Sequence, residues 1–274
     1  MLKTRVITAL LLAGGLLSAL FLLPRAGMMA IFVAIVGIAA WEWAGLLRLG
    51  TLGRWSYAVL TALPCIALLA FDMPLRLLAE LWQVAMIFWL LVAPLWFRFK
   101  WSLQANFTGY LVGWLLLIPS WGAMAILYQR SPWLLLAAMA LVWVADIAAY
   151  FSGRTLGRHK LAPTISPGKT WEGALGAVIG VLIYALAVGN ATGHLAAMTS
   201  RQLLLAALGM LLLTAVSIVG DLFESLVKRQ AGVKDSSALL PGHGGVLDRI
   251  DSLTSTLPLS ALAAVFLLAP ASGH

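Results

Sequence analysis

Charged residues are scarce in this chain. Only 10% of its 274 residues are charged, whereas 62% are hydrophobic, and the mean hydropathy is +0.98. A soluble domain carries about 25% charged residues, because most of its surface must face water, so a soluble globular fold is excluded. A disordered chain is excluded as well, since such chains are polar and rich in charge. The composition therefore predicts an all-α, polytopic integral membrane protein.

Cysteine is almost absent too, and the single Cys65 excludes a disulfide framework. It lies in an apolar run, where we interpret it as a small buried hydrophobic residue. The net charge of +8 comes from Lys and Arg residues that are scattered between apolar runs and not clustered on one soluble module. We therefore interpret the basic excess as a signal of membrane topology, and nucleic acid is not an expected partner.

Apolar runs of about 20 residues predict nine transmembrane helices. Their expected ranges are 6–23, 26–47, 55–71, 75–97, 107–128, 132–152, 171–189, 202–225 and 251–269. The first run follows Lys3 and Arg5, as a signal peptide would. It is too long for the hydrophobic region of a signal peptide, lacks an evident cleavage site and precedes further spans, so we expect it to be retained.

Nine spans place the two ends of the chain on opposite sides of the membrane. With the N-terminus in the cytoplasm, four of the 18 Lys and Arg residues fall outside, which leaves 14 inside. This is the asymmetry of the positive-inside rule. We expect residues 1–105 to form an N-terminal group of helices and residues 106–274 to form the catalytic region. The polar loops 153–170 and 226–250 are then cytoplasmic.

The first of these loops contains the run Ser166-Pro167-Gly168-Lys169-Thr170. Proline directly after serine predicts a helix that starts there, with Ser166 as its cap. The free N–H groups of such a helix, together with Lys169, would form a phosphate cradle. The run is not a P-loop, because position 163 is proline where that motif needs glycine. Taken alone, the segment is equally compatible with a basic loop that lies on anionic lipid.

Acidic residues gather in the second half of the chain, where five lie between residues 221 and 251. Helical spacing predicts one polar face at the end of the eighth span and another at the start of the ninth. The first face comprises Ser217, Asp221, Glu224, Ser225 and Lys228, and the second comprises Asp248, Asp251, Ser252 and Ser255. Ionisable groups at membrane depth are functional candidates, and oxygen clusters suit Mg²⁺ held with substrate phosphates. Helix capping by Asp248 or Asp251 is the alternative interpretation.

Between these faces lies a glycine-rich loop, residues 240–247, whose backbone N–H groups could bind anions. His243 within it could donate a hydrogen bond to phosphate, form a structural hydrogen bond or act as a general base. A zinc site is disfavoured, because no second His or Cys stands at ligand spacing.

Asp146, on one face with Tyr150, is either a site residue or a buried brace between helices. Glu42 is interpreted as a membrane-interface residue. Acidic side chains that can bind a metal ion, together with basic side chains that can bind phosphate, indicate a site for phosphoryl or nucleotidyl transfer.

The sequence around these residues resembles a known family. Ser225-Leu226-Val227-Lys228-Arg229, then Lys234-Asp235, then the run from Pro241 to Asp251 looks like the signature of the CDP-diacylglycerol synthase (phosphatidate cytidylyltransferase) family. Ser166-Pro167, Lys169-Thr170 and Glu172-Gly173 resemble it as well, as does Asp146 with Ala149-Tyr150. The resemblance covers about residues 140–255. Earlier residues match only in hydropathy and in the pair Glu42-Trp43.

This resemblance implies an inner-membrane enzyme of phospholipid biosynthesis that converts CTP and phosphatidic acid to CDP-diacylglycerol and pyrophosphate. It also implies Mg²⁺, with a second cation, and a homodimer in the lipid bilayer. A phosphatidate oxygen would attack the α-phosphorus of CTP in line, which needs positioning and charge neutralisation above all. A CTP-dependent lipid or polyprenol kinase is the alternative enzyme. A transporter is the alternative of another class, although it would place its acids at the bilayer midplane.

The residue roles follow from the resemblance together with the chemistry above. We predict that the catalytic residues are Asp221, Asp248, Lys169, Asp251 and His243. Substrate would be bound by Ser166, Lys169, Thr170, Glu172, Lys228, Arg229, Lys234, Asp235, His243, Gly244, Gly245 and Arg249. Metal would be held by Asp221, Asp248, Glu224, Asp251 and Asp146.

Overall fold

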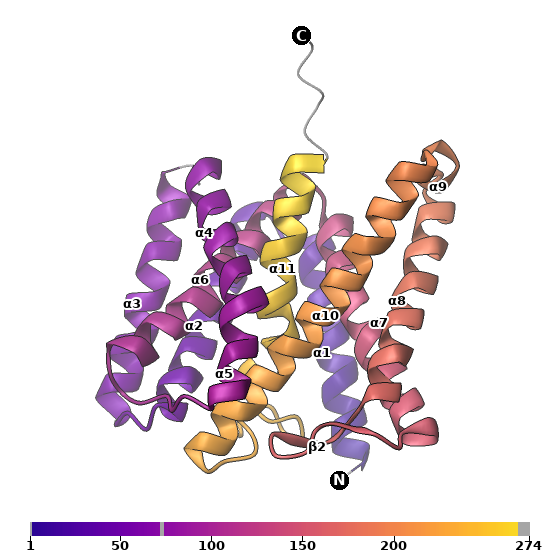
Figure 1. Ribbon diagram of the computed structural model, residues 1–274. Helices are drawn as coiled ribbons and strands as arrows, with labels where there is room; N and C mark the ends of the chain where they lie inside the picture. The colour runs from indigo at the N-terminus through magenta and orange to yellow at the C-terminus, as the bar shows by residue number, and fades with distance from the viewer. Residues whose placement is uncertain (1, 72–73, 268–274) are drawn as a thin grey trace.

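The computed structural model describes residues 2–71 and 74–267, and in them nine helical segments of at least 20 residues run back and forth along a bundle (Figure 1). The segments are α1 (Leu2–Leu22), α2 (Arg25–Leu46), α3 (Thr51–Ala70), the continuous stretch α4 (Leu75–Ile87), η1 (Phe88–Val92) and α5 (Ala93–Phe99), α6 (Phe107–Arg130), α7 (Pro132–Leu156), α8 (Trp171–Ala191), α10 (Ser200–Ala231) and α11 (Leu247–Leu267). The short helix α9 (His194–Ala197) and the strands β1 (Lys160–Ala162) and β2 (Ser166–Thr170) are the remaining elements of the described residues.

Seven of these segments are long and apolar enough to cross a membrane, namely α2, α3, the stretch from α4 to α5, α6, α7, α8 and α10. The expected polytopic, all-α membrane protein is thereby confirmed. The other two expected spans, 6–23 and 251–269, fall on α1 and α11, and residues 268–269 lie outside the described residues. The number of nine membrane crossings stays a prediction.

Helix α6 forms the centre of the bundle, and it packs against α2, α4, α7 and α11. Pro119 lies inside this helix, where its ring removes a backbone hydrogen bond. Two polar contacts lie beside it: the Pro119 carbonyl accepts a hydrogen bond from Trp82 Nε1 at 3.0 Å, and Ser120 Oγ donates to Thr254 O at 3.0 Å. These buried contacts tie α6 to α4 and α11.

Helices α10 and α11 cross closely, and small residues allow it. A Cβ atom on Gly220 would overlap the hydroxyl of Ser255, so only glycine fits there. Ser255 Oγ donates to Val216 O at 2.9 Å, and Ser252 Oγ donates to Ser217 O at 3.2 Å. The polar faces predicted on the eighth and ninth spans therefore pack against each other.

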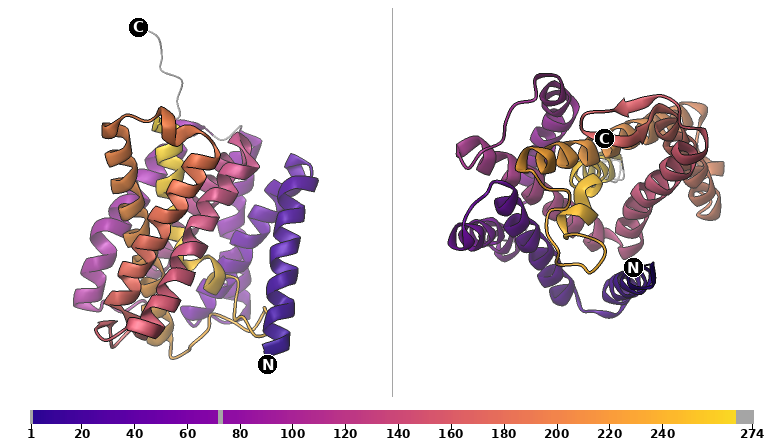
Figure 2. Two further views of the ribbon diagram at one scale, coloured as in Figure 1. Left: turned by 90° about the vertical axis from the view of Figure 1, so that its right-hand side faces the viewer. Right: turned by 90° about the horizontal axis from the view of Figure 1, so that it is seen from below.

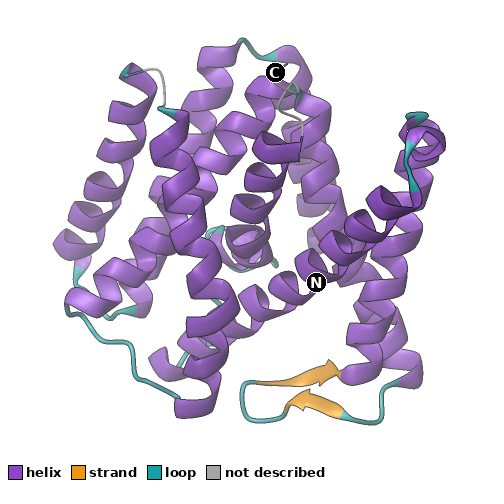
Figure 3. Cartoon of the chain, turned by 45° about the horizontal axis from the view of Figure 1, so that its top comes forward, coloured by secondary structure: helices purple, strands orange, loops and turns teal. Residues whose placement is uncertain are grey.

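The segment 160–170 forms a β-hairpin at one end of the bundle (Figure 3). The helix start predicted at Ser166-Pro167 is wrong, because residues 166–170 pair with β1 as strand β2. Helix α8 begins only at Trp171, and its cap is Thr170, whose Oγ1 accepts the N–H of Gly173 at 3.1 Å. Strand pairing fixes the backbone of Pro167 in an extended conformation, which overrides its preference for a first helical turn.

The hairpin and the loop 232–246 lie at the same end of the bundle, as expected for two polar segments on one side of a membrane (Figure 1). Helix α1 stands at the edge of the molecule (Figure 2), with most of its described side chains exposed. It reaches the second loop through Thr8, whose Oγ1 donates to Pro241 O at 3.2 Å.

Candidate active site

A pocket of about 430 Å³ lies between α7, α8, α10 and the β-hairpin. Asp146 of α7 and Asp221 of α10 line it, and Lys169 enters it from β2. Lys169 Nζ lies 2.5 Å from Asp221 Oδ2, and both side chains keep partial access to solvent. Ser166 and Thr170, two further predicted residues, also line the pocket. The structure thus brings five predicted residues together.

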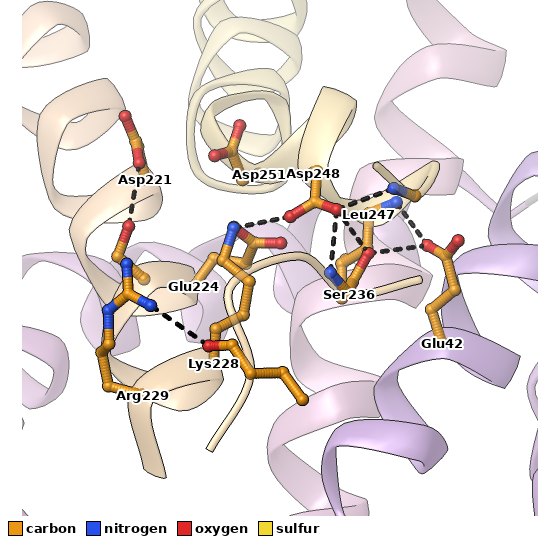
Figure 4. Close-up of polar contacts among 12 residues, drawn as sticks. Glu42, Asp221, Glu224, Lys228, Arg229, Ser236, Leu247, Asp248 and Asp251 are labelled. Atoms are coloured by element: carbon orange, nitrogen blue, oxygen red, sulfur yellow. Dashed lines mark hydrogen bonds and ion pairs between the residues drawn. The ribbon is translucent and has the colours of Figure 1, made fainter. Parts of the chain in front are cut away.

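Asp251, in the second turn of α11, adds a third carboxylate to this group. It lies near enough to Asp221, Asp146 and Lys169 for their charges to act on one another, although it does not line the pocket. Figure 4 shows its side chain between those of Asp221 and Asp248, and its Oδ1 accepts the N–H of Ser252 at 2.7 Å. We call Asp146, Asp221 and Asp251 the acidic cluster. Three helices, α7, α10 and α11, supply one carboxylate each.

Lys228 lies in a separate network, between two buried carboxylates. Its Nζ is 2.5 Å from Glu224 Oε2 and 2.6 Å from Asp248 Oδ1, and the three side chains are at most 11% exposed. The two carboxylates depend on Lys228, because its loss would leave them buried without a counter-charge. Lys228, predicted to bind phosphate, therefore neutralises carboxylates in this structure.

Asp248 also holds the loop that precedes α11. Its Oδ2 accepts the N–H of Gly245 at 2.7 Å and both the N–H and the hydroxyl of Ser236, at 2.9 and 2.8 Å (Figure 4). Both donors belong to the loop and neither belongs to α11, so the helix-capping alternative for Asp248 stays a prediction. No contact joins Asp248 to Asp221 in the part of the chain that the structure describes.

Glu42 of α2 is a residue whose role the sequence missed. It is fully buried and caps α11 from outside: its Oε2 accepts the N–H of Leu247 at 2.6 Å, and its Oε1 accepts the N–H of Val246 at 3.0 Å. The hydroxyls of Ser236 and Ser237 donate to it as well. The interpretation of Glu42 as a membrane-interface residue does not describe this buried position. Its partners lie about two hundred residues away, so the pair Glu42-Trp43 in the resemblance was the single signal available.

The glycine-rich loop is folded around these two carboxylates. A Cβ atom on Gly245 would overlap Glu42 and the hydroxyl of Ser236, so this position requires glycine. The N–H groups of residues 245–247 donate to Asp248 and Glu42; they do not point to an open anion site. His243 Nδ1 is buried without a hydrogen-bond partner, and its three interpretations stay open. Gly244, beside it, has a positive φ of 79°.

The other predicted residues lie at the same end of the molecule but do not line the pocket. Arg229 donates to Val233 O at 3.2 Å, and Glu172 accepts the backbone N–H of His159. Lys234 and Asp235 are exposed in the loop. Arg249 is exposed in the first turn of α11, and its charge interacts with that of Asp146.

The acidic cluster has the donor chemistry of a magnesium site, because carboxylate oxygens are the ligands that Mg²⁺ prefers. Glu224, whose charge interacts with that of Asp251, has a buried Oε1 that lacks any hydrogen-bond partner. Among the described residues, no group of three or more Asp, Glu, His or Cys side chains is arranged to hold a metal ion. The carboxylate chemistry suits the ion, but the described side chains are not arranged to hold it, and the ligand assignments stay predictions.

Comparisons with known proteins agree with the resemblance. The model of a cytidylyltransferase family matches residues 3–267. The phosphatidate cytidylyltransferase of Pseudomonas aeruginosa is 44% identical over 269 residues, which cover 95% of this chain and 96% of that protein. The phosphatidate cytidylyltransferase of Haemophilus influenzae is 38% identical over an alignment that covers 98% of this chain and 100% of that protein. The resemblance inferred from the sequence is confirmed.

Proposed function

The chain belongs to the cytidylyltransferase family, and we propose that it transfers the cytidylyl group of CTP to phosphatidate, giving CDP-diacylglycerol and pyrophosphate. Two relatives with that name match nearly its whole length. The observation that carries the proposal is the pocket itself, in which Lys169 contacts Asp221 beside Asp146. The pocket lies at one end of a bundle of membrane helices, where a lipid phosphate and a water-soluble nucleotide can meet.

The reaction is an in-line displacement. An oxygen of the phosphatidate phosphate forms a bond to the α-phosphorus of CTP, and the bond from that phosphorus to the oxygen bridging to the β-phosphorus breaks. The electron pair leaves with pyrophosphate. The attacking oxygen is already anionic, so no general base is needed, and His243 need not act as one. What the protein must supply is orientation and neutralisation of charge, and Lys169 supplies a cation in the pocket.

We further propose that Mg²⁺ binds at the acidic cluster of Asp146, Asp221 and Asp251. The ion would neutralise phosphate charge and polarise phosphoryl oxygens. Asp248 remains a predicted ligand as well, although Lys228 occupies its Oδ1 in this structure. A second cation and a homodimer also remain part of the proposal.

The site is proposed to face the cytoplasm, from the inner membrane. The support is the asymmetry of 14 basic residues to four and the position of the hairpin and the loop 232–246 at the same end of the bundle. CTP can then approach from the aqueous side and phosphatidate from the bilayer.

The reaction class can be tested with the purified protein, phosphatidate in detergent micelles, Mg²⁺, and CTP labelled at either the α- or the γ-phosphorus. A cytidylyltransferase places the α-label in the lipid and releases the γ-label as pyrophosphate. A CTP-dependent kinase would place the γ-label in the lipid and leave the α-label in CDP, and that result would overturn the proposal. The Asp221→Asn variant is the control for contaminating activity.

A further inference from the structure

Arg154 lines the same pocket as Lys169, and none of the roles described above uses it. It lies in the last turn of α7, and its Nη1 donates a hydrogen bond to the hydroxyl of Tyr150 at 2.7 Å. Tyr150 also lines the pocket. Within the described ranges, no carboxylate forms an ion pair with Arg154. The guanidinium is therefore a positioned cation with free donors.

The side chain of Arg154 reaches back toward the acidic cluster. Helical side chains point toward the N-terminus of their helix, and Arg154 accordingly contacts Tyr150, one turn earlier. Tyr150 in turn lies one turn, about 6 Å along the axis, beyond Asp146. Arg154 and Lys169 thus line the pocket from different walls, one from α7 and the other from the hairpin.

The surroundings of the pocket suit a lipid. Large apolar side chains around it are exposed, including Tyr150, Phe151 and Leu175, which are 57%, 61% and 61% exposed. Trp171, at the start of α8, is 62% exposed, and tryptophan favours the level of lipid headgroups. Arg154 lies in the last turn of α7 and Trp171 in the first turn of α8, so both lie at the same end of the bundle. A phospholipid can therefore bring its phosphate to this level without leaving the bilayer.

We infer that Arg154, oriented by Tyr150, binds the phosphate of the lipid substrate and forms a lipid-phosphate subsite together with Lys169; this inference rests on the proposed function. A phosphate monoester carries about 1.5 to 2 negative charges at neutral pH. Lys169 is already paired with Asp221, so it cannot balance that charge alone. A guanidinium binds two phosphate oxygens at once, which also fixes the orientation of the attacking oxygen.

The test measures the two substrates separately. Steady-state kinetics in mixed micelles would be recorded for Arg154→Ala, Tyr150→Phe and the control Arg158→Ala, which removes an exposed arginine outside the pocket. Arg154→Ala is expected to raise the KM for phosphatidate about 10-fold or more, because a charge-assisted hydrogen bond is lost. The KM for CTP should stay within about 2-fold of the wild-type value. Tyr150→Phe should shift the same constant by a smaller factor, and Arg158→Ala should leave both constants unchanged.

Three results would overturn the inference. A rise in the KM for CTP alone would assign Arg154 to the nucleotide, unchanged constants would remove it from the site, and an equal effect of Arg158→Ala would indicate general surface charge. If Arg154→Ala fails to fold in detergent, Arg154→Gln takes its place in the same assay. Binding of a short-chain, water-soluble phosphatidate, measured by calorimetry, separates this inference from the proposed function. A wild type that binds the lipid but transfers no α-label contradicts the function alone, whereas equal binding by wild type and variant contradicts the subsite.

Discussion

Glu42 of α2 accepts a hydrogen bond from the backbone N–H of Leu247, the first residue of α11, at 2.6 Å. The N-terminal N–H groups of a helix have no partner within it and carry a partial positive charge, so a buried carboxylate there is favourable. Ser236 Oγ donates to Glu42 and also to Asp248, which joins the two carboxylates. Glu42 therefore sets the start of the helix that carries Asp248 and Asp251.

The first prediction concerns the stability that this cap supplies. Glu42→Ala would leave the buried N–H of Leu247 and the partly buried N–H of Val246 without partners, and each costs about 1–3 kcal/mol. We expect a loss of about 2–6 kcal/mol, with a smaller loss for Glu42→Gln. Thermal unfolding in detergent measures the change. The control is Glu80→Ala, since Glu80 forms an exposed pair with Arg76 and should matter little. Equal unfolding temperatures for the two alanine variants would contradict the capping role.

The second prediction concerns Lys169. Because its ammonium contacts Asp221 in the pocket, Lys169→Ala should lower kcat by about 10²-fold or more, as expected when a transition-state electrostatic contact is lost. Folding should be unaffected, since the side chain is partly exposed. Lys160→Ala is the matched control, because Lys160 is exposed on the partner strand. Activity near that of wild type at saturating CTP would remove Lys169 from the reaction.

Local patterns in the sequence were sufficient to predict much of this structure. Apolar runs predicted the helical segments, and helical spacing predicted the faces that pack where α10 crosses α11. The residue types near Asp221 and Lys169 predicted that they share one site, and the structure brings them to 2.5 Å. The first two predictions depend on neighbours within a few turns. The third depends on the expectation that both polar segments lie on one side of the membrane and on the family resemblance.

Pairings between distant segments could not be predicted in the same way. The predicted polar face of α10 divides in the structure, because Asp221 contacts Lys169 whereas Glu224 contacts Lys228. A helical wheel places these acids on one side but does not tell which neighbouring helix each one meets. The strand at Ser166 likewise depends on pairing with β1, and a local preference of proline for helix starts gave the wrong element.

The third prediction concerns topology. Single cysteines at Thr155 and Ala238, both exposed, should be labelled by an impermeant thiol reagent only from the cytoplasmic side of sealed vesicles. A cysteine at Thr192, exposed near the opposite end of the bundle, should be labelled only from the other side. Cys65 is fully buried and should not react, so the native chain serves as background. Labelling of Thr155→Cys from the outer face of intact cells would reverse the proposed orientation.

The last prediction separates the two aspartates that the sequence treated alike. Asp221 is 31% exposed in its side chain and contacts Lys169, whereas the Asp248 side chain is 3% exposed and holds Lys228. Asp221→Asn should therefore abolish most activity, raise the Mg²⁺ concentration needed for the remainder, and leave the unfolding temperature near that of wild type.

Asp248→Asn should lower activity and stability together. It weakens the hydrogen bonds that Asp248 accepts from Lys228, Gly245 and Ser236, and a hydrogen bond to a charged group contributes about 1.5–3 kcal/mol. Lys228 keeps Glu224 as its counter-ion. Activity with titrated Mg²⁺ and thermal unfolding, measured on both variants, distinguish the roles. Asp248→Asn could instead need more Mg²⁺ and unfold at the same temperature as wild type. That result would show that Asp248 holds the metal, and that its contacts with Lys228 and the loop contribute little to the fold. Unchanged activity of Asp221→Asn would remove the acidic cluster from the proposed mechanism.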